Sequence, residues 1–90
     1  MRLEQDIRVI NKLGLHTRAA AKLAKLCSRF ESSIEIASSK RRADAKSIMS
    51  VMMLAACQGT ELKMVVEGED AAEALRQIND LFESCFEERE

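Results

Sequence analysis

The sequence predicts an α+β fold, a two-layer open-faced sandwich with its elements in the order β-α-β-β-α-β-α. Short segments in which apolar and charged residues alternate, as in 61–67, indicate strands with one covered and one solvent-exposed face. Longer segments in which apolar residues recur every three or four positions, as in 71–85, indicate helices that cover such a sheet. The same pattern suits ferredoxin-like folds, so it leaves the strand order open.

The first expected strand, residues 3–10, leads through a turn into the first expected helix, 17–29. Asn11-Lys12-Leu13-Gly14 has the composition of a turn and ends the strand. Apolar residues then recur at helical spacing from Ala20 to Cys27. His16, the only histidine in the chain, therefore stands where a loop becomes a helix.

Two further strands are expected over 32–38 and 41–45, joined by a turn at 38–40, and a second helix is expected over 48–57. Ser47 stands directly before that helix and is expected to cap it through its hydroxyl oxygen, a contribution of about 1 kcal/mol. Gly59 is the expected helix stop.

The last strand is expected over 60–67, with Leu62, Met64 and Val66 on its covered face. The final helix begins at Asp70, whose spacing to Glu73 predicts a capping box. Its expected apolar stripe comprises Ala71, Ala74, Leu75, Ile78, Leu81, Phe82 and Cys85. The tail 87–90 is expected to be frayed.

Length and composition predict one domain over residues 1–90, without linker, repeat or proline. No apolar run approaches the ~20 residues of a membrane span, and the N-terminal residues lack a signal-peptide core, so we expect a cytoplasmic protein without membrane insertion. The three cysteines are widely spaced, each within an expected helix, and are expected to be packed free thiols. With one histidine and no Cys-x-x-Cys pair, no metal site is expected.

His16 and Arg18 are the candidate site residues by chemistry. The first N–H groups of a helix have no intrahelical partner and, with the helix dipole, favour an anion such as phosphate. The same positive end disfavours a protonated imidazole, which keeps the ring nucleophilic. Arg18 can bring its guanidinium fork to the same anion. An isolated histidine without an acidic partner is, however, most often a solvated residue at a helix end.

Two segments decide between these interpretations. Gly14–Ala20 (Gly-Leu-His-Thr-Arg-Ala-Ala) resembles the active-site signature of the histidine-containing phosphocarrier (HPr) family of the phosphoenolpyruvate-dependent sugar phosphotransferase system. Lys46–Met52 resembles the regulatory-serine segment of that family, at the family's distance from His16. The resemblance extends over 7–82. One departure is Ala19, where the family usually has proline; alanine is expected to loosen the first helical turn slightly.

The resemblance implies a four-stranded antiparallel sheet covered on one face by three helices. It implies a carrier and not a turnover enzyme, without a cofactor. Enzyme I, charged by phosphoenolpyruvate, passes a phosphoryl group to Nδ1 of His16, which delivers it to a histidine of an enzyme IIA domain while Arg18 neutralises charge. Ser47 is implied as a regulatory phosphosite for an HPr serine kinase/phosphorylase. The expected oligomeric state is a monomer.

The helix after Ser47 is too continuously apolar for a single buried face. Val51 and Leu54, with Ala55 beside them, have the spacing of a core pair, which leaves Ile48, Met49 and Met52 on another side. A methionine-rich stripe is usually core. Exposed next to a phosphate site it forms an adaptable docking surface. The resemblance favours docking, with partner contacts at Thr17, Lys25, Ile48, Met49 and Met52.

Charge is unevenly distributed and leaves other functions open. Residues 12–46 hold nine Lys/Arg and three Asp/Glu, whereas 47–90 hold three Lys/Arg and ten Asp/Glu. A basic face steers acidic partners. It also suits a small RNA-binding domain, but Phe30 is the only aromatic residue in 12–46, so no base-stacking platform is expected. Two further alternatives remain: a nitrogen-type regulatory carrier of the same mechanism, and a protein-interaction module in which His16 is incidental.

Overall fold

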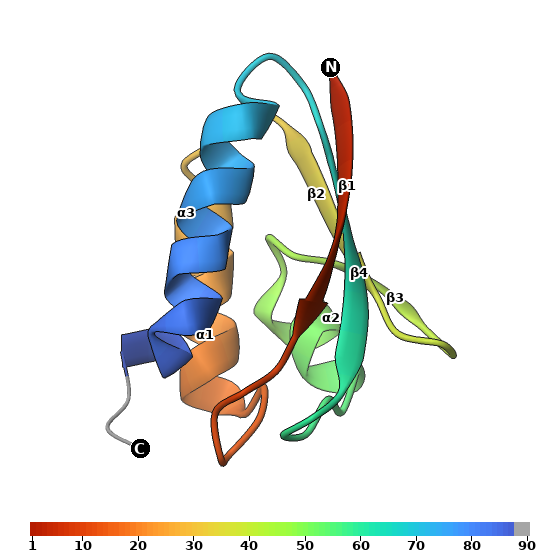
Figure 1. Ribbon diagram of the computed structural model, residues 1–90, viewed down its shortest axis with the longest axis vertical. Helices are drawn as coiled ribbons and strands as arrows, with labels where there is room; N and C mark the ends of the chain where they lie inside the picture. Colours follow the sequence, from red (N-terminus) through yellow and green to blue (C-terminus); the bar gives the residue numbers. More distant parts are fainter. Residues whose placement is uncertain (88–90) are drawn as a thin grey trace.

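Four strands form one antiparallel sheet in the order β1-β4-β2-β3 in the computed structural model, which describes residues 1–87 (Figure 1). The strands are β1 (Arg2–Arg8), β2 (Ser33–Ala37), β3 (Arg42–Asp44) and β4 (Glu61–Glu67). The helices are α1 (Thr17–Cys27), α2 (Ile48–Met53), α3 (Ala71–Glu83) and a closing 3₁₀ turn, η1 (Cys85–Glu87). This arrangement confirms the predicted element order and the sheet that the resemblance implied.

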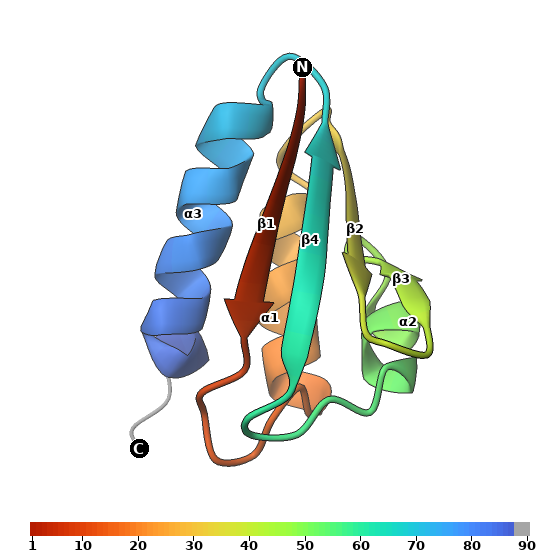
Figure 2. The same cartoon turned by 45° about the vertical axis from the view of Figure 1, so that its right-hand side comes forward.

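All three α-helices lie on one face of the sheet, and the other face is open to solvent (Figure 2). Strand β4 is central, and its inward side chains Leu62, Met64 and Val66 are buried, as the alternation predicted. In the register, Leu62 lies opposite Ile7 of β1, and Met64 lies opposite Ile36 of β2. Apolar cross-strand pairs of this kind fix the register, because a slip of one residue would turn the whole set to solvent.

Small residues let α1 approach the sheet closely. Its buried stripe consists of Ala19, Ala20, Leu23, Ala24 and Cys27. Helix α3 buries Ala71, Ala74, Ile78 and Phe82, whereas the other predicted members of its stripe are only half-buried. Phe86 of η1 closes the core below α3, with its ring centroid 4.8 Å from that of Phe82. The helix that bears His16 at its start is therefore rigidly packed against the sheet.

The predicted second helix is too long. Helix α2 ends at Met53, with Leu54 as its C-cap, and not near residue 57. Ala55 takes a left-handed conformation (φ +53°), the position at which helices more often have glycine. Gly59, the expected stop, lies in the turn before β4, where its N–H donates to the Val9 carbonyl over 2.7 Å. As a result Ala55 is exposed, and the prediction that it packs beside Val51 and Leu54 is wrong.

The predicted capping box of α3 is also wrong. Asp70 occupies the N-cap position, but its carboxylate makes no capping hydrogen bond. It accepts instead from the N–H groups of Glu31 (2.9 Å) and Ser32 (3.0 Å) and from the Ser32 hydroxyl, which lowers its pKa. Glu73 pairs with Arg76 and Gln77, and these hydrogen bonds lower its pKa to about 2. Asp70 therefore forms long-range hydrogen bonds to residues 31 and 32 in place of a local capping hydrogen bond.

The ends of other elements differ by one to three residues. Strand β1 ends at Arg8 because Val9 leaves the β-ladder to exchange hydrogen bonds with the turn at 59–60. Helix α1 ends at Cys27, where the N–H of its cap Ser28 donates to the Ala24 carbonyl and the N–H of Arg29 donates to the Leu26 carbonyl. The tail 87–90 was predicted to be frayed, and its residues 88–90 lie outside the described residues.

Candidate functional site

The loop before His16 is held by hydrogen bonds on both sides. Asn11 is fully buried, and its amide group donates to the Gly14 carbonyl over 2.8 Å. The Leu15 N–H donates to the Ala56 carbonyl over 2.9 Å, and the Leu15 side chain is buried in the core. The residue before His16 is therefore fixed to the segment that follows α2.

Gly14 is required at its position by conformation and by space. Its φ is +67°, and a Cβ there would lie 2.5 Å from the Ala56 oxygen and 2.8 Å from the Cys57 Cα. An L-residue disfavours this conformation, and the two contacts are with backbone atoms that have little freedom to move. The glycine lets the loop lie directly against the chain after α2.

His16 is the N-cap of α1, as predicted. Its carbonyl accepts from the Ala20 N–H over 2.8 Å, while its side chain makes no capping hydrogen bond. The imidazole is half-exposed at the positive end of an eleven-residue helix. The first N–H groups of such a helix lack a preceding turn to bind, so the end favours an anion.

Helix α1 also carries exposed cationic side chains. Thr17 and Arg18 are exposed at the first two helical positions, and Lys25 is exposed two turns later. Within residues 1–87, neither Arg18 nor Lys25 forms an ion pair. The first turn of α1 holds no acidic residue. The local field therefore attracts negative charge.

Helix α2 packs against α1 and presents the second group of predicted residues. Ser47 caps it, as predicted, with its hydroxyl oxygen accepting from the Ser50 N–H over 3.2 Å. Val51 and Leu54 are buried, whereas Ile48, Met49 and Met52 are 43, 70 and 38% exposed. The interpretation of these three side chains as core is therefore wrong, since they form part of the surface.

Further exposed apolar residues were missed in the sequence. Met53 on α2 is 55% exposed, and Leu13 and Ile10 in the loop before His16 are 69 and 44% exposed. The surplus of apolar residues on α2 was the available signal for Met53. For Leu13 the signal was its place inside a turn, where an apolar side chain has no helix or strand face to cover.

The cysteines differ from the prediction in one case. Cys27 is buried in α1, and burial raises its pKa to about 12. Cys57 is exposed, because α2 ends before it, and Cys85 is half-exposed. Among residues 1–87, no group of His, Cys, Asp and Glu side chains is placed to hold a metal ion. In the same part of the chain, no helix has the length and apolar character needed to cross a membrane.

Known proteins are similar to this chain in sequence and in fold. Residues 3–84 match the family described as the PTS HPr component phosphorylation site. The phosphocarrier protein HPr of Xylella fastidiosa (strain Temecula1) is 46% identical over 86 residues, which cover 96% of this chain and 97% of that protein. The phosphocarrier protein NPr of Shewanella violacea is 39% identical, covering 97% and 96% of the two chains.

The three-dimensional likeness is equally extensive. The crystal structure of HPr-C-His from Thermoanaerobacter tengcongensis superposes with a TM-score of 0.93 at 40% identity, covering 98% of this chain and 99% of that one. Sequence and fold thus agree over nearly the full length. The chain belongs to the HPr family, the phosphocarrier proteins of the phosphotransferase system, which pass phosphoryl groups between enzyme I and enzyme IIA and catalyse no turnover themselves.

Proposed function

We propose that His16 is the residue that carries the phosphoryl group. A ring nitrogen of His16, Nδ1 by family resemblance, attacks the phosphorus of a phosphohistidine on enzyme I. The new N–P bond forms as the N–P bond on enzyme I breaks, and the released imidazole takes up a proton. Transfer to enzyme IIA repeats this exchange. The observation that carries the proposal is the position of the single histidine, half-exposed at the N-terminus of α1.

The site suits temporary storage of the group. A helix N-terminus stabilises an adjacent anion by about 0.3–1 kcal/mol, and by ~2 kcal/mol when partly buried. Arg18, exposed two residues after His16, adds a guanidinium that neutralises phosphoryl oxygens. Transfer of a phosphoryl group needs little beyond such positioning and charge stabilisation. This mild stabilisation holds the group while onward transfer stays favourable.

Partner docking is assigned to the surface formed by Thr17, Lys25, Ile48, Met49 and Met52, called the docking surface below. Its apolar members are exposed on α2, and α2 packs against the helix that bears His16. Methionine side chains adapt to differently shaped partners, which a carrier with both a donor and an acceptor requires. The exposed cations of α1 attract acidic partner faces.

Ser47 is assigned as a regulatory phosphosite. Its hydroxyl is half-buried at the start of α2, directly before Ile48 of the docking surface. A phosphate there adds about −1.5 to −2 charges beside the apolar contacts and opposes an acidic partner. Where the cell has an HPr serine kinase/phosphorylase, this modification reduces docking.

We place this carrier, one domain working as a monomer, in the cytoplasm and in the sugar branch of the system. The three cysteines are free thiols, which suits a reducing compartment. The segment at Ser47 and the 46% identity to an HPr, against 39% to an NPr, support the sugar branch over the nitrogen branch. RNA binding has less support, because Phe30 is half-buried against the core and offers no stacking surface.

Intact-mass measurement tests the central proposal. The protein is incubated with enzyme I and phosphoenolpyruvate, and one acid-labile, base-stable phosphoryl group is expected. His16→Gln should take up none while keeping the parental melting temperature. Phosphorylation of the His16→Gln protein would contradict the assignment. Unchanged binding of enzyme I by both proteins, without any phosphoryl uptake, would favour an interaction module.

A further inference from the structure

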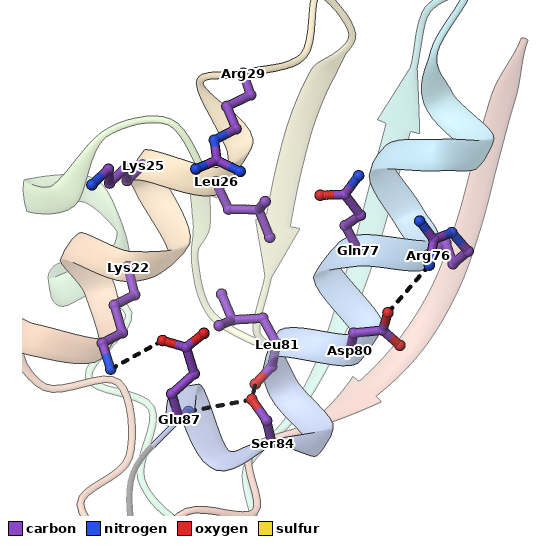
Figure 3. A pocket seen from close by; sticks show the side chains of 10 residues that line it. All are labelled: Lys22, Lys25, Leu26, Arg29, Arg76, Gln77, Asp80, Leu81, Ser84 and Glu87. Atoms are coloured by element: carbon purple, nitrogen blue, oxygen red, sulfur yellow. Dashed lines mark hydrogen bonds and ion pairs between the residues drawn. The ribbon is translucent and has the colours of Figure 1, made fainter.

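A second concave site lies between α1 and α3, on the side of α1 away from α2 (Figure 3). The cleft has a volume of about 690 Å³. One wall includes Lys22 and Lys25 of α1 and Arg29 in the turn after it, and the α3 wall includes Arg76 and Asp80. The volume lies in the range of about 300–1,000 Å³ typical of small-molecule sites. Neither His16 nor Ser47 lines it.

Two of the four cationic side chains that line the cleft form no ion pair within residues 1–87. Arg76 is held by Asp80 at 3.4 Å and by Glu73. Lys22 donates to the Phe86 carbonyl over 2.7 Å and lies 3.6 Å from Glu87. Within residues 1–87, Lys25 and Arg29 form no ion pair, and no acidic residue other than Asp80 and Glu87 lines the cleft. The α1 wall therefore carries an uncompensated positive charge.

Lys25 and Arg29 are four residues apart, and both lie on the wall above the same floor. Lys25 belongs to α1 and Arg29 to the turn that follows it, and both side chains are long and flexible enough to turn toward one anion. A guanidinium fork and an ammonium together suit the oxygens of a phosphate group. Figure 3 shows Arg29 above the cleft and Leu26 pointing into it, whereas Lys25 extends to the side, so its flexible side chain would turn toward the anion on binding.

The floor is apolar. Leu26 of α1 and Leu81 of α3 are half-buried, and each packs against the core on one side while lining the cleft on the other. A ligand body resting on these two side chains would remove apolar surface from water at about 25 cal/mol per Å². Free phosphate would gain nothing from this floor, whereas an organic phosphate with an apolar body would.

We propose that the cleft binds a small organic phosphate monoester, with its phosphate on Lys25 and Arg29 and its apolar body on Leu26 and Leu81. The site involves neither His16 nor Arg18, and it shares only Lys25 with the docking surface.

Three probes of graded chemistry test the proposal by ¹⁵N NMR titration of the whole chain at low ionic strength. Phenyl phosphate should shift amides of 22–29 and 77–84. Inorganic phosphate should bind about tenfold more weakly, because it lacks the apolar body. Phenyl glucoside, which is neutral, should cause no shifts at the same concentrations.

Arg29→Ser should weaken phenyl phosphate binding by about tenfold, by removal of the guanidinium fork. Arg42→Ser is the matched control, because Arg42 is equally an exposed arginine but lies on β3, and it should bind as the parent does. Equal binding by Arg29→Ser and parent would overturn the proposal, as would equal affinity for inorganic and phenyl phosphate. Shifts confined to the start of α1 would overturn it as well. Uptake of phosphoryl by Arg29→Ser from enzyme I, measured by mass, should be unchanged, so failure here is distinct from failure of the His16 assignment.

Discussion

The Leu15 N–H donates to the Ala56 carbonyl over 2.9 Å, so the residue before His16 is joined to the segment after α2. This bond crosses 41 positions of sequence, and it joins the histidine loop to the segment that follows α2, the helix that presents the apolar part of the docking surface. The position of the imidazole relative to its partners therefore depends on packing as well as on the motif around it.

Gly14→Ala should lower the free energy of unfolding and slow phosphoryl transfer. The left-handed conformation alone costs an L-residue about 1–2 kcal/mol. The added Cβ would also meet the Ala56 oxygen at 2.5 Å, which displaces the loop that carries His16. Urea unfolding and single-turnover phosphorylation by enzyme I measure the two effects.

Gly59→Ala is the matched control for Gly14. Gly59 also has a positive φ, +92°, but a Cβ there meets nothing within 4 Å. It should lose stability of the same order from conformation while transferring phosphoryl at the parental rate. If both variants transferred equally, the close approach of Gly14 to Ala56 would have no role in placing His16.

Arg18→Ala should slow phosphoryl transfer and leave the melting temperature unchanged, because the side chain is exposed and stabilises only the phosphoryl group. Arg18→Lys should restore part of the rate, since lysine keeps the charge but lacks the planar fork. Arg41→Ala, which removes an exposed arginine from the turn between β2 and β3, is the control for net charge. A parental rate in Arg18→Ala would exclude the assigned role.

Ser47 variants separate a cap from a switch. Ser47→Ala loses the hydrogen bond to the Ser50 N–H and should lose about 1 kcal/mol of stability, with transfer near the parental rate. Ser47→Asp remains a competent cap and should fold normally, but accept phosphoryl much more slowly because its charge opposes an acidic partner. Thermal melts and transfer rates of both variants decide the matter. If Ser47→Asp accepted phosphoryl at the parental rate, Ser47 would be a helix cap only.

Ile48→Glu and Met49→Glu should weaken enzyme I binding with little change in thermal stability. Both side chains are exposed, so the substitution removes apolar contact with a partner and not core packing. Ala72→Glu on the exposed side of α3 is the control for added negative charge. Binding is measured by calorimetry at two salt concentrations, and association should slow as salt rises. If both variants bound enzyme I with the parental affinity, α2 would not be part of the docking surface.

Asp70→Asn should destabilise the protein at neutral pH and progressively less in acid. Hydrogen bonds from Ser32 and Glu31 lower the pKa of Asp70 from its ordinary 3.8. A folded-state pKa below the unfolded value stabilises the native state above the unfolded pKa, and this contribution is lost as pH falls through the folded pKa. Urea unfolding from pH 7 to about pH 3 should show the difference from the parent shrinking. Asp6→Asn, an exposed change on β1, is the control for the loss of one carboxylate.

Periodicity was sufficient for the layers of the fold but not for the ends of its elements. The alternation in β4 correctly placed Leu62, Met64 and Val66 in the core. The end of α2 was missed because Ala55 adopts a conformation that alanine disfavours, and tertiary contacts of its neighbour Ala56 support it. The partner of Asp70 was missed because Ser32 is 38 residues away in sequence.

The site was predictable where chemistry is local. A histidine and an arginine at a helix start, and a serine before another helix, are short-range patterns, and the structure has each at the predicted position. Exposure of Ile48 and Met49 depends on which face of α2 meets α1, which periodicity over six residues does not resolve. The cleft between α1 and α3 arises from two helices far apart in the chain, and no local pattern marks it.

The chain starts at the end of the molecule opposite the start of α1 (Figure 1). Met1 is held there by its carbonyl, which accepts from the Gly68 N–H over 2.9 Å in the turn before α3. A dye, a biotin or a surface tether attached at Met1 would therefore leave the histidine end unobstructed. Immobilised on a sensor chip through the α-amino group of Met1, the protein could accept and release phosphoryl groups repeatedly. Each transfer could then be timed on single molecules.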